Sequence, residues 1–311
     1  MNNVYTNTYS AYSCFEEFLP YLPPDEMDEK TRSILLHRQF MALNLQDDFL
    51  FGKVMEDMEI LRLLLERILR IPIAKVVQVT PQRTFDIDPA ARGIRLDVYA
   101  ADEQGTRYSI EMQKYNEYNI PKRSRYYTSM VDLDQLEKGT AYRELRQSVV
   151  IFLCMFDPFH MGLQKYTFLR RCEEAPELDL GDGTAQIILT GAEPEGADPV
   201  IAQFFRYCAS STDETAAACD GELVQRIHQR VRMLKNNRKL EVEYMKMWEL
   251  EQKRYQEGVM NGIAQGVAQG IAQTQEHMIG RMLSDSFSDE QIVKYTQCTP
   301  ELLEKVKKSM A

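Results

Sequence analysis

Apolar and polar residues alternate with two different periods along the chain, and these periods predict which segments are helices and which are strands. Helical spacing of apolar residues predicts a helix that begins after Asn44 or Asp47, and helices over 31–43, 60–69 and 121–138. Runs rich in β-branched and aromatic residues predict two strands that hold Asp97 and Glu111, and further strands over 75–84, 149–156, 165–171 and 185–189. After about residue 198 the pattern is helical.

The order of these elements predicts the α/β fold class, with a mixed sheet flanked by helices and an all-helical C-terminal extension. Changes of pattern along the chain predict five parts. They are an N-terminal arm over 1–43, a core over 44–195, a helical extension over 196–257, a helix with glycine at every fourth position over 258–280, and a short helical hairpin over 281–311.

The segment 93–113 concentrates the candidate chemistry. Its two strands flank a turn of sequence DEQG, which is typical of a β-hairpin. Opposite residues of paired strands lie close together and alternate residues share a face, so Asp97, Glu111 and Gln113 are expected on one surface. Oxygen ligands of this kind suit a hard divalent cation. Two ordinary hairpin carboxylates, balanced by Arg95 without a metal, are the alternative.

Charge changes this picture locally. The chain of 311 residues has a net charge of −10, which alone argues against a nucleic-acid partner. Between residues 107 and 127, however, five cationic side chains accompany only two acidic ones. The region around Glu111 is therefore basic although the protein is acidic, and phosphate binding is compatible with it.

Several other classes of protein find no support in the sequence. The six cysteines form no CxxC pair and no cluster with histidine, so structural zinc is not expected. The four histidines do not accompany a plausible nucleophile. The apolar run 149–156 is too short to span a bilayer, and the N-terminus lacks the pattern of a signal peptide. These features predict a cytoplasmic protein with reduced cysteines and no membrane association.

Four motifs, in this order, resemble those of a known family. They are DDFLFGKV at 47–54; RLDV and IEMQ between 95 and 113; KRSRYYTSM at 122–130, followed by KGTAY at 138–142; and the glycine repeat of the tail. Together they resemble the PD-(D/E)XK nuclease family transposases, relatives of the recombination-promoting nucleases. The resemblance covers about residues 44–280 and implies a restriction-endonuclease-like core.

This resemblance implies a Mg²⁺-dependent DNA endonuclease, with Mn²⁺ as a possible substitute. Asp97, Glu111 and the backbone carbonyl of Met112 would bind the metal, and Asp48 would be a further ligand. For Asp48, a charge that complements the start of its helix is the alternative role. Gln113 stands where such nucleases usually carry lysine. It can position a water molecule by a hydrogen bond but supplies no charge.

The helix that follows is expected to bind DNA. Its candidate contacts combine cations and aromatic rings, and they are Lys122, Arg123, Arg125, Tyr126 and Tyr127. The alternative is an amphipathic helix with a solvated basic face. At the level of the whole protein, the alternative to an endonuclease is a catalytically inactive nuclease fold that binds nucleic acid or protein.

The tail leaves two pairs of interpretations open. Glycine at 258, 262, 266 and 270 predicts either close helix packing in a homo-oligomer or a flexible linker. The last two predicted helices, over 288–296 and 299–309, resemble a helix-turn-helix in layout, and a simple packing hairpin is the alternative. A capping box of Ser288 and Gln291 is expected to begin the first of them.

Overall fold

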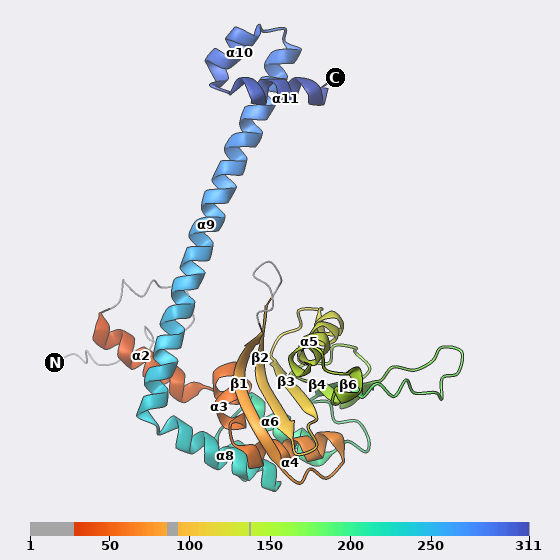
Figure 1. Ribbon diagram of the computed structural model, residues 1–311. Coiled ribbons are helices and arrows are strands. Elements are labelled where there is room, and N and C mark those ends of the chain that lie inside the picture. The colour runs from red at the N-terminus through yellow and green to blue at the C-terminus, as the bar shows by residue number, and fades with distance from the viewer. Residues whose placement is uncertain (1–27, 86–92, 137, 311) are drawn as a thin grey trace, which may run out of the picture. The chain divides into compact units, whose positions relative to one another are not determined.

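A computed structural model describes residues 28–85, 93–136 and 138–310 (Figure 1). Contacts divide the chain into two compact units. One unit is Ser33–Tyr244, and the other combines Met1–Arg32 with Met245–Ala311. Most of the predicted N-terminal arm lies outside the described residues.

A six-stranded sheet forms the centre of the Ser33–Tyr244 unit. In spatial order its strands are β1 (Val76–Phe85), β2 (Ile94–Asp102), β3 (Arg107–Gln113), β4 (Ser148–Cys154), β6 (Thr184–Thr190) and β5 (Lys165–Phe168). The pairs β3–β4 and β4–β6 are parallel, and the other pairs are antiparallel. The predicted mixed α/β fold is therefore confirmed. All seven residues of β4 are buried, as expected for a central parallel strand.

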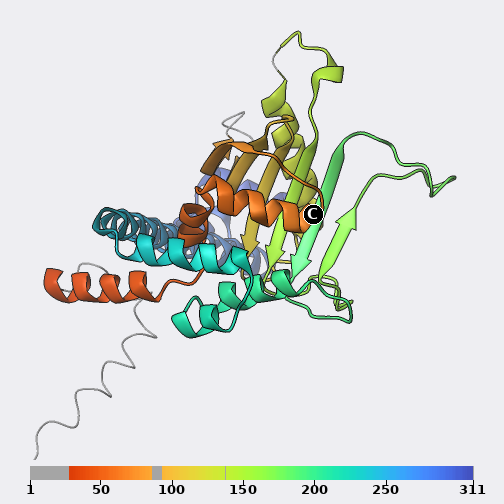
Figure 2. The same cartoon turned by 90° about the horizontal axis from the view of Figure 1, so that it is seen from below.

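Helices cover both faces of this sheet. Helix α5 (Ile120–Gln135) packs against β3 and β4, and its face of the sheet holds a core of apolar residues that includes Tyr127 and Phe152. Helices α3 (Asp48–Met55) and α4 (Met58–Leu69) contact β1, and α3 also contacts β2. Helices α6 (Pro199–Ala209) and α8 (Glu222–Lys235) lie beyond α4, as the view from below shows (Figure 2).

Helix α3 sits close to the strand that carries Asp97. Most of its residues are buried, and Gly52 faces the sheet. A Cβ atom at Gly52 would lie 3.7 Å from the Cβ of Pro81 and 3.9 Å from the carbonyl oxygen of Asp97. The small residue therefore lets the backbones approach, and α3 brings its first residue, Asp48, to the neighbourhood of β2.

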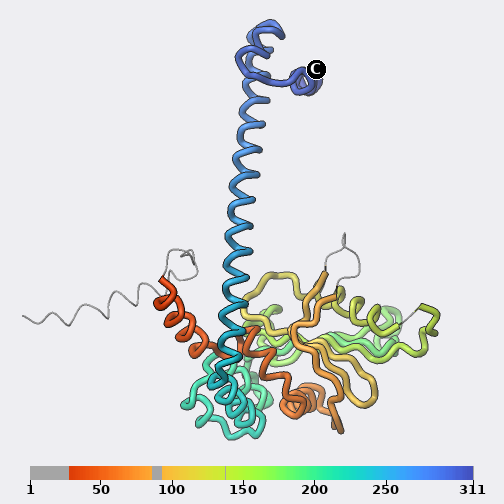
Figure 3. Tube along the Cα trace, turned by 60° about the vertical axis from the view of Figure 1, so that its left-hand side comes forward, coloured from red at the N-terminus to blue at the C-terminus, as the bar shows by residue number. Residues whose placement is uncertain are grey.

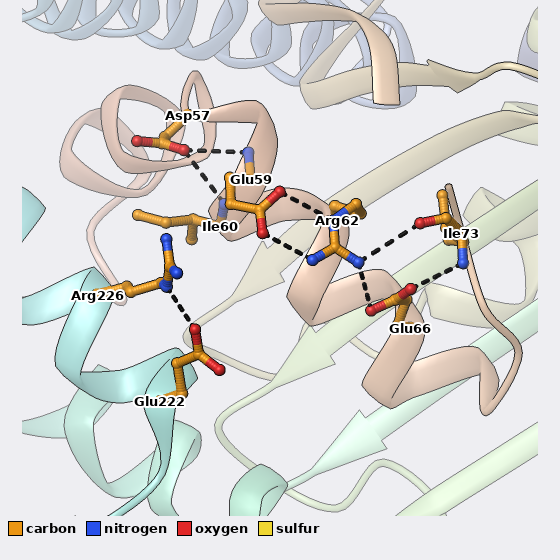
Figure 4. A network of polar contacts seen from close by, with 8 residues as sticks. All are labelled: Asp57, Glu59, Ile60, Arg62, Glu66, Ile73, Glu222 and Arg226. Atoms are coloured by element: carbon orange, nitrogen blue, oxygen red, sulfur yellow. Dashed lines mark hydrogen bonds and ion pairs between the residues drawn. The ribbon is translucent and has the colours of Figure 1, made fainter. Parts of the chain in front are cut away.

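A polar network fixes α4 and the turn that leads into β1 (Figure 4). The Asp57 side chain caps the helix by accepting a hydrogen bond from the Glu59 amide at 3.1 Å. Arg62 then pairs with Glu59 and with Glu66, at 2.7 Å in each case. Glu66 in turn accepts a hydrogen bond from the Ile73 amide at 2.8 Å, which holds the connection to the sheet.

Some predicted boundaries are wrong by a few residues. Helix α5 ends at Gln135 rather than at 138, because the Gln135 amide group donates to Ser148 at 2.8 Å and accepts from the Arg146 amide at 3.1 Å. Strand β5 ends at Phe168 rather than at 171. The start of helix α3 agrees with one of the two predicted starts, because the helix begins after Asp47, whose carboxylate accepts a hydrogen bond from the backbone amide of Asn44.

The remaining helices are α2 (Glu29–Ala42), α7 (Asp213–Ala217), α9 (Arg238–Ser284), α10 (Asp289–Thr296) and α11 (Pro300–Met310), and a 3₁₀ helix, η3, spans Tyr142–Glu144. The glycine repeat lies inside α9, in a continuous helix of 47 residues. In the described residues, the segment predicted as a repeat helix, 258–280, is therefore the middle of a longer helix and neither begins nor ends at a break.

Helices α10 and α11 pack as a hairpin on the end of α9 (Figure 3). Their shared core contains Ile279, Ile292, Cys298, Leu303 and Val306. The predicted capping box of Ser288 and Gln291 is confirmed. On the basic end of α11, Lys305 pairs with Glu276 and Lys307 with Asp289. These ion pairs favour the packing hairpin over a DNA-binding helix.

Two further findings concern the described residues as a group. Their five cysteines are all free. No helix among them combines the length and the apolar character that crossing a membrane requires.

Candidate active site

The two predicted acids meet where the central hairpin opens. Strands β2 and β3 are paired from Ala101 and Arg107 up to Val98 and Ile110. Beyond that point β2 remains paired with β1 as far as Ile94. Strand β3 remains paired with β4 to its last residue. The next opposed residues, Asp97 and Glu111, therefore lie where the two strands part.

Their carboxylates replace the missing ladder bonds. The Asp97 amide donates a hydrogen bond to Glu111 Oε1 at 3.2 Å, and the Met112 amide donates one to Asp97 Oδ2 at 2.9 Å. Ser109 Oγ also donates to Glu111 Oε1 at 3.3 Å. The hairpin thus holds the two acids next to each other through bonds to the backbone.

Burial makes this pair of acids electrostatically costly. Glu111 is only 1% exposed. Burial raises the pKa of Glu111 well above its ordinary value, and the charge of Asp97 raises it further. Burial, followed by the charge of Asp48, raises the pKa of Asp97 to about 7. A neighbouring cation is needed to keep both carboxylates ionised at neutral pH.

Asp48 contributes negative charge to the same region. It is the first residue of α3, and burial together with the charge of Asp47 raises its pKa. Within the described parts of the chain, however, no group of three or more His, Cys, Asp or Glu side chains is arranged to hold a metal ion. The two carboxylates that the hairpin holds next to each other are those of Asp97 and Glu111, and Met112, whose amide donates to Asp97, directly follows Glu111.

The donor atoms present at this site are oxygens, which are the ligands that a hard divalent cation prefers. One buried and one half-buried carboxylate, both with raised pKa values, are oxygen donors of the kind that Mg²⁺ accepts when it keeps several of its water molecules. The Met112 carbonyl already accepts a hydrogen bond from Gln113 Nε2 at 2.8 Å. Gln113 therefore lies directly beside these donors.

Arg123 lies beside the acids rather than on the outer surface of α5. Its Nη1 donates to Gln113 Oε1 at 2.7 Å, and its Nη2 lies 3.7 Å from Glu111 Oε2. Nη2 also donates to the hydroxyl of Tyr127 at 3.1 Å. The guanidinium carbon lies 5.5 Å from the ring centre of Phe152. Arg123 is thus the closest positive charge to Glu111.

From the sequence, Arg123 was predicted to contact DNA, and an interaction with Asp97 or Glu111 was not predicted for it. The available signal was its spacing, because residues four apart share one face of a helix and Tyr127 follows Arg123 by four. Of the other predicted contacts, Lys122 and Arg125 are exposed. Tyr126 is 38% exposed and Tyr127 only 7%. The structure therefore divides the five predicted contacts into an exposed set, Lys122, Arg125 and Tyr126, and a more buried pair, Arg123 and Tyr127.

Comparison with known proteins gives one result that covers this site. A family model described as "PD-(D/E)XK nuclease family transposase" matches residues 48–173. The matched segment begins at Asp48 and contains Asp97, Glu111, Gln113 and Arg123. Searches of curated proteins and of solved structures returned no match.

Asp97→Asn is expected to stabilise the metal-free protein above neutral pH. The folded Asp97 has a pKa of about 7 against an ordinary 3.8, so the unfolded chain releases this proton first as pH rises. The stability that the group contributes is complete below about pH 4 and is lost as pH rises to about 7. At pH 8 the neutral amide should therefore raise the free energy of unfolding by about 2 kcal/mol or more, measured by urea denaturation.

Asp132→Asn is the matched control, because this half-buried carboxyl also has a raised pKa but has Ser148 as its hydrogen-bond partner. Added Mg²⁺ should stabilise the parent and the control, but not Asp97→Asn. Lower stability of Asp97→Asn at pH 8 without metal would contradict this interpretation of the acid pair.

Proposed function

We propose that the protein is a metal-dependent DNA endonuclease linked to recombination or mobile elements, because its residues 48–173 match the model of the PD-(D/E)XK nuclease family transposases. The observation that carries the proposal is the pair of half-buried Asp97 and buried Glu111 at the opening of the β2–β3 hairpin. Strongly shifted pKa values of this kind are concentrated at functional sites.

We assign the metal to Asp97, Glu111 and the Met112 carbonyl, with Asp48 as a nearby charge. Mg²⁺ is the expected ion and Mn²⁺ a substitute. When bound, such an ion favours ionisation of an attacking water and offsets negative charge on the phosphate. The raised pKa values of the two acids also favour a cation at this site, because added positive charge nearby makes their ionisation favourable.

Arg123 supplies the positive charge that Gln113 cannot. Gln113 Oε1 accepts from Arg123, and its Nε2 donates one hydrogen to the Met112 carbonyl. An amide nitrogen has two hydrogens, so one donor remains to orient a water molecule or a phosphate oxygen. The guanidinium stays protonated at every working pH and can offset charge that develops on the phosphate. Glutamine and arginine together thus perform the task of one lysine.

The outer face of α5 positions the DNA. Lys122 and Arg125 are exposed and no acid in the described chain pairs with them, so they are available to phosphates. Phosphate contacts fix the register of the strand relative to the acids without selecting a sequence. Attack by water in line with the leaving oxygen would give a 5′-phosphate and a 3′-hydroxyl.

Glu111→Gln and Asp97→Asn are each expected to abolish nicking of supercoiled plasmid with Mg²⁺ or Mn²⁺, because each removes a charged metal ligand. Loss should exceed about a hundredfold. Asp132→Asn should nick at the parental rate. Calorimetric titration with Mn²⁺ should show binding to the parent and to Asp132→Asn only. Nicking that persists in both site variants would contradict the site, and a parent inactive with every metal would favour the catalytically inactive binding module.

Arg123→Gln is expected to lower the nicking rate by about a hundredfold, because it removes the positive charge nearest to Glu111. The pH at which activity reaches half its maximum should also rise, since an unbalanced acid pair ionises less readily. Arg143→Gln, which neutralises an exposed arginine on η3, is the control. Adding Gln113→Lys to Arg123→Gln should restore part of the lost activity. No restoration would show that Arg123 acts through something other than charge.

We further propose that α9 mediates self-association. Nothing lies within 4 Å of a Cβ atom built on Gly258, Gly262, Gly266 or Gly270 in the described chain. The apolar residues that follow these glycines are exposed by 43–63%, and they are Val259, Ile263, Val267 and Ile271. Each glycine weakens an exposed helix by about 1 kcal/mol relative to alanine. Close packing of a second α9 over this surface would offset that cost.

Ile263→Glu is therefore expected to reduce the molecular mass measured by sedimentation equilibrium at micromolar concentration. Gln265→Glu adds the same charge on the opposite side of the helix, two positions away, and should leave the mass unchanged. A parent that is monomeric at all concentrations would instead favour the linker interpretation of the repeat.

A further inference from the structure

A cavity of about 510 Å³ lies beside the acid pair, and neither the metal site nor the family match assigns it a ligand. The end of β2 next to Gly93 forms one wall, and the first turns of α5 form the other. Cations and aromatic rings line it, and they include Arg95, Lys122, Arg123, Arg125, Tyr126 and Tyr127.

The charge of this cavity is one-sided. Among the described residues that line it, four side chains are cationic and none is acidic. Arg95, Lys122 and Arg125 are exposed and form no ion pair with any described residue. The fourth cation, Arg123, is paired with Glu111 at 3.7 Å and with Glu117 at 3.9 Å. Three cations without a paired acid on a concave surface are suited to a phosphorylated ligand.

Its walls also offer contacts that a phosphate alone does not use. Tyr126 lines the cavity and is 38% exposed, so part of its side chain can contact a planar ligand there. Asn119 is another lining residue, and its Oδ1 is a buried acceptor without a hydrogen-bond partner in the described chain.

Arg123 connects this cavity to the acids. It lines the cavity and at the same time lies 3.7 Å from Glu111 Oε2. A ligand in the cavity is therefore the immediate neighbour of whatever phosphate the acids act on. In a paired duplex the bases are stacked inside the helix and cannot enter a cavity, whereas an unpaired nucleotide can present its ring and its phosphate together.

We propose that this cavity binds an unpaired nucleotide next to the cleavage point, so that the preferred substrate is DNA with an extrahelical or single-stranded residue. The cations hold its phosphate and Tyr126 stacks on its base. The inference rests on the proposed nuclease function for the position of the cleaved bond, but the cavity's preference for an unpaired base can be measured without cleavage.

The test measures binding by fluorescence anisotropy with the full chain carrying Asp97→Asn, in the absence of divalent metal. Three labelled DNAs of equal length are compared: a paired duplex, the duplex with one extra unpaired adenine, and the duplex with one extra abasic nucleotide. The last has the same phosphates but no base. The unpaired adenine should bind about tenfold more tightly than either control DNA, as expected for one stacked base.

Substitutions identify the residue responsible. Tyr126→Ala should reduce the preference to less than about twofold, whereas Tyr126→Phe should keep it because the ring remains. Tyr142→Ala, which removes an 89% exposed tyrosine that does not line the cavity, should also keep it. With 2-aminopurine as the unpaired base, its fluorescence should be quenched on binding to the parent and not to Tyr126→Ala.

Equal affinity for the three DNAs, no binding of any of them, or a preference that survives Tyr126→Ala would overturn the proposal. These outcomes can be distinguished from a failure of the proposed nuclease activity. Plasmid nicking without base preference would retain the nuclease and reject the nucleotide cavity. Preference without nicking under any metal would retain the cavity and reject the nuclease.

Discussion

The placement of a buried and a half-buried carboxylate at one point of the sheet is the constraint on which the rest of the site depends. Asp97 and Glu111 accept backbone hydrogen bonds across the hairpin at the place where its ladder stops. A regular ladder would satisfy those amides without side chains, so the acids are part of the reason that β2 and β3 can separate there. Their charge is then enclosed between α3 and α5, where solvent screens it poorly.

That enclosed charge explains the position of Arg123. An arginine on the outer surface of α5 would be free for phosphate, but this one turns toward Gln113, Glu111 and Tyr127. Its side chain fills space against Phe152 while its nitrogens meet polar partners on two elements. The same residue lines the adjacent basic cavity, so the acid pair and the cavity share one wall.

Local patterns were sufficient to predict most of the fold. The turn at 102–105 sets the register that places Asp97 opposite Glu111, and apolar spacing predicted α4 and the buried strand β4. The inward turn of Arg123 was not predictable, because basic residues on an amphipathic helix have the same composition whether they face solvent or a buried acid. The end of α5 depends on contacts between Gln135 and residues more than ten positions away, which no local pattern contains.

The energetics of the acid pair bear on whether the fold is active or only a binding module. Both carboxyls have raised pKa values in the metal-free chain, so their ionisation at neutral pH opposes folding. Amide side chains of the same size could accept the same backbone hydrogen bonds without that penalty. A module that only bound a partner would gain nothing from two acids enclosed so close together. A site that attracted a divalent cation would need their charge, and binding of the cation would then reverse the loss of stability.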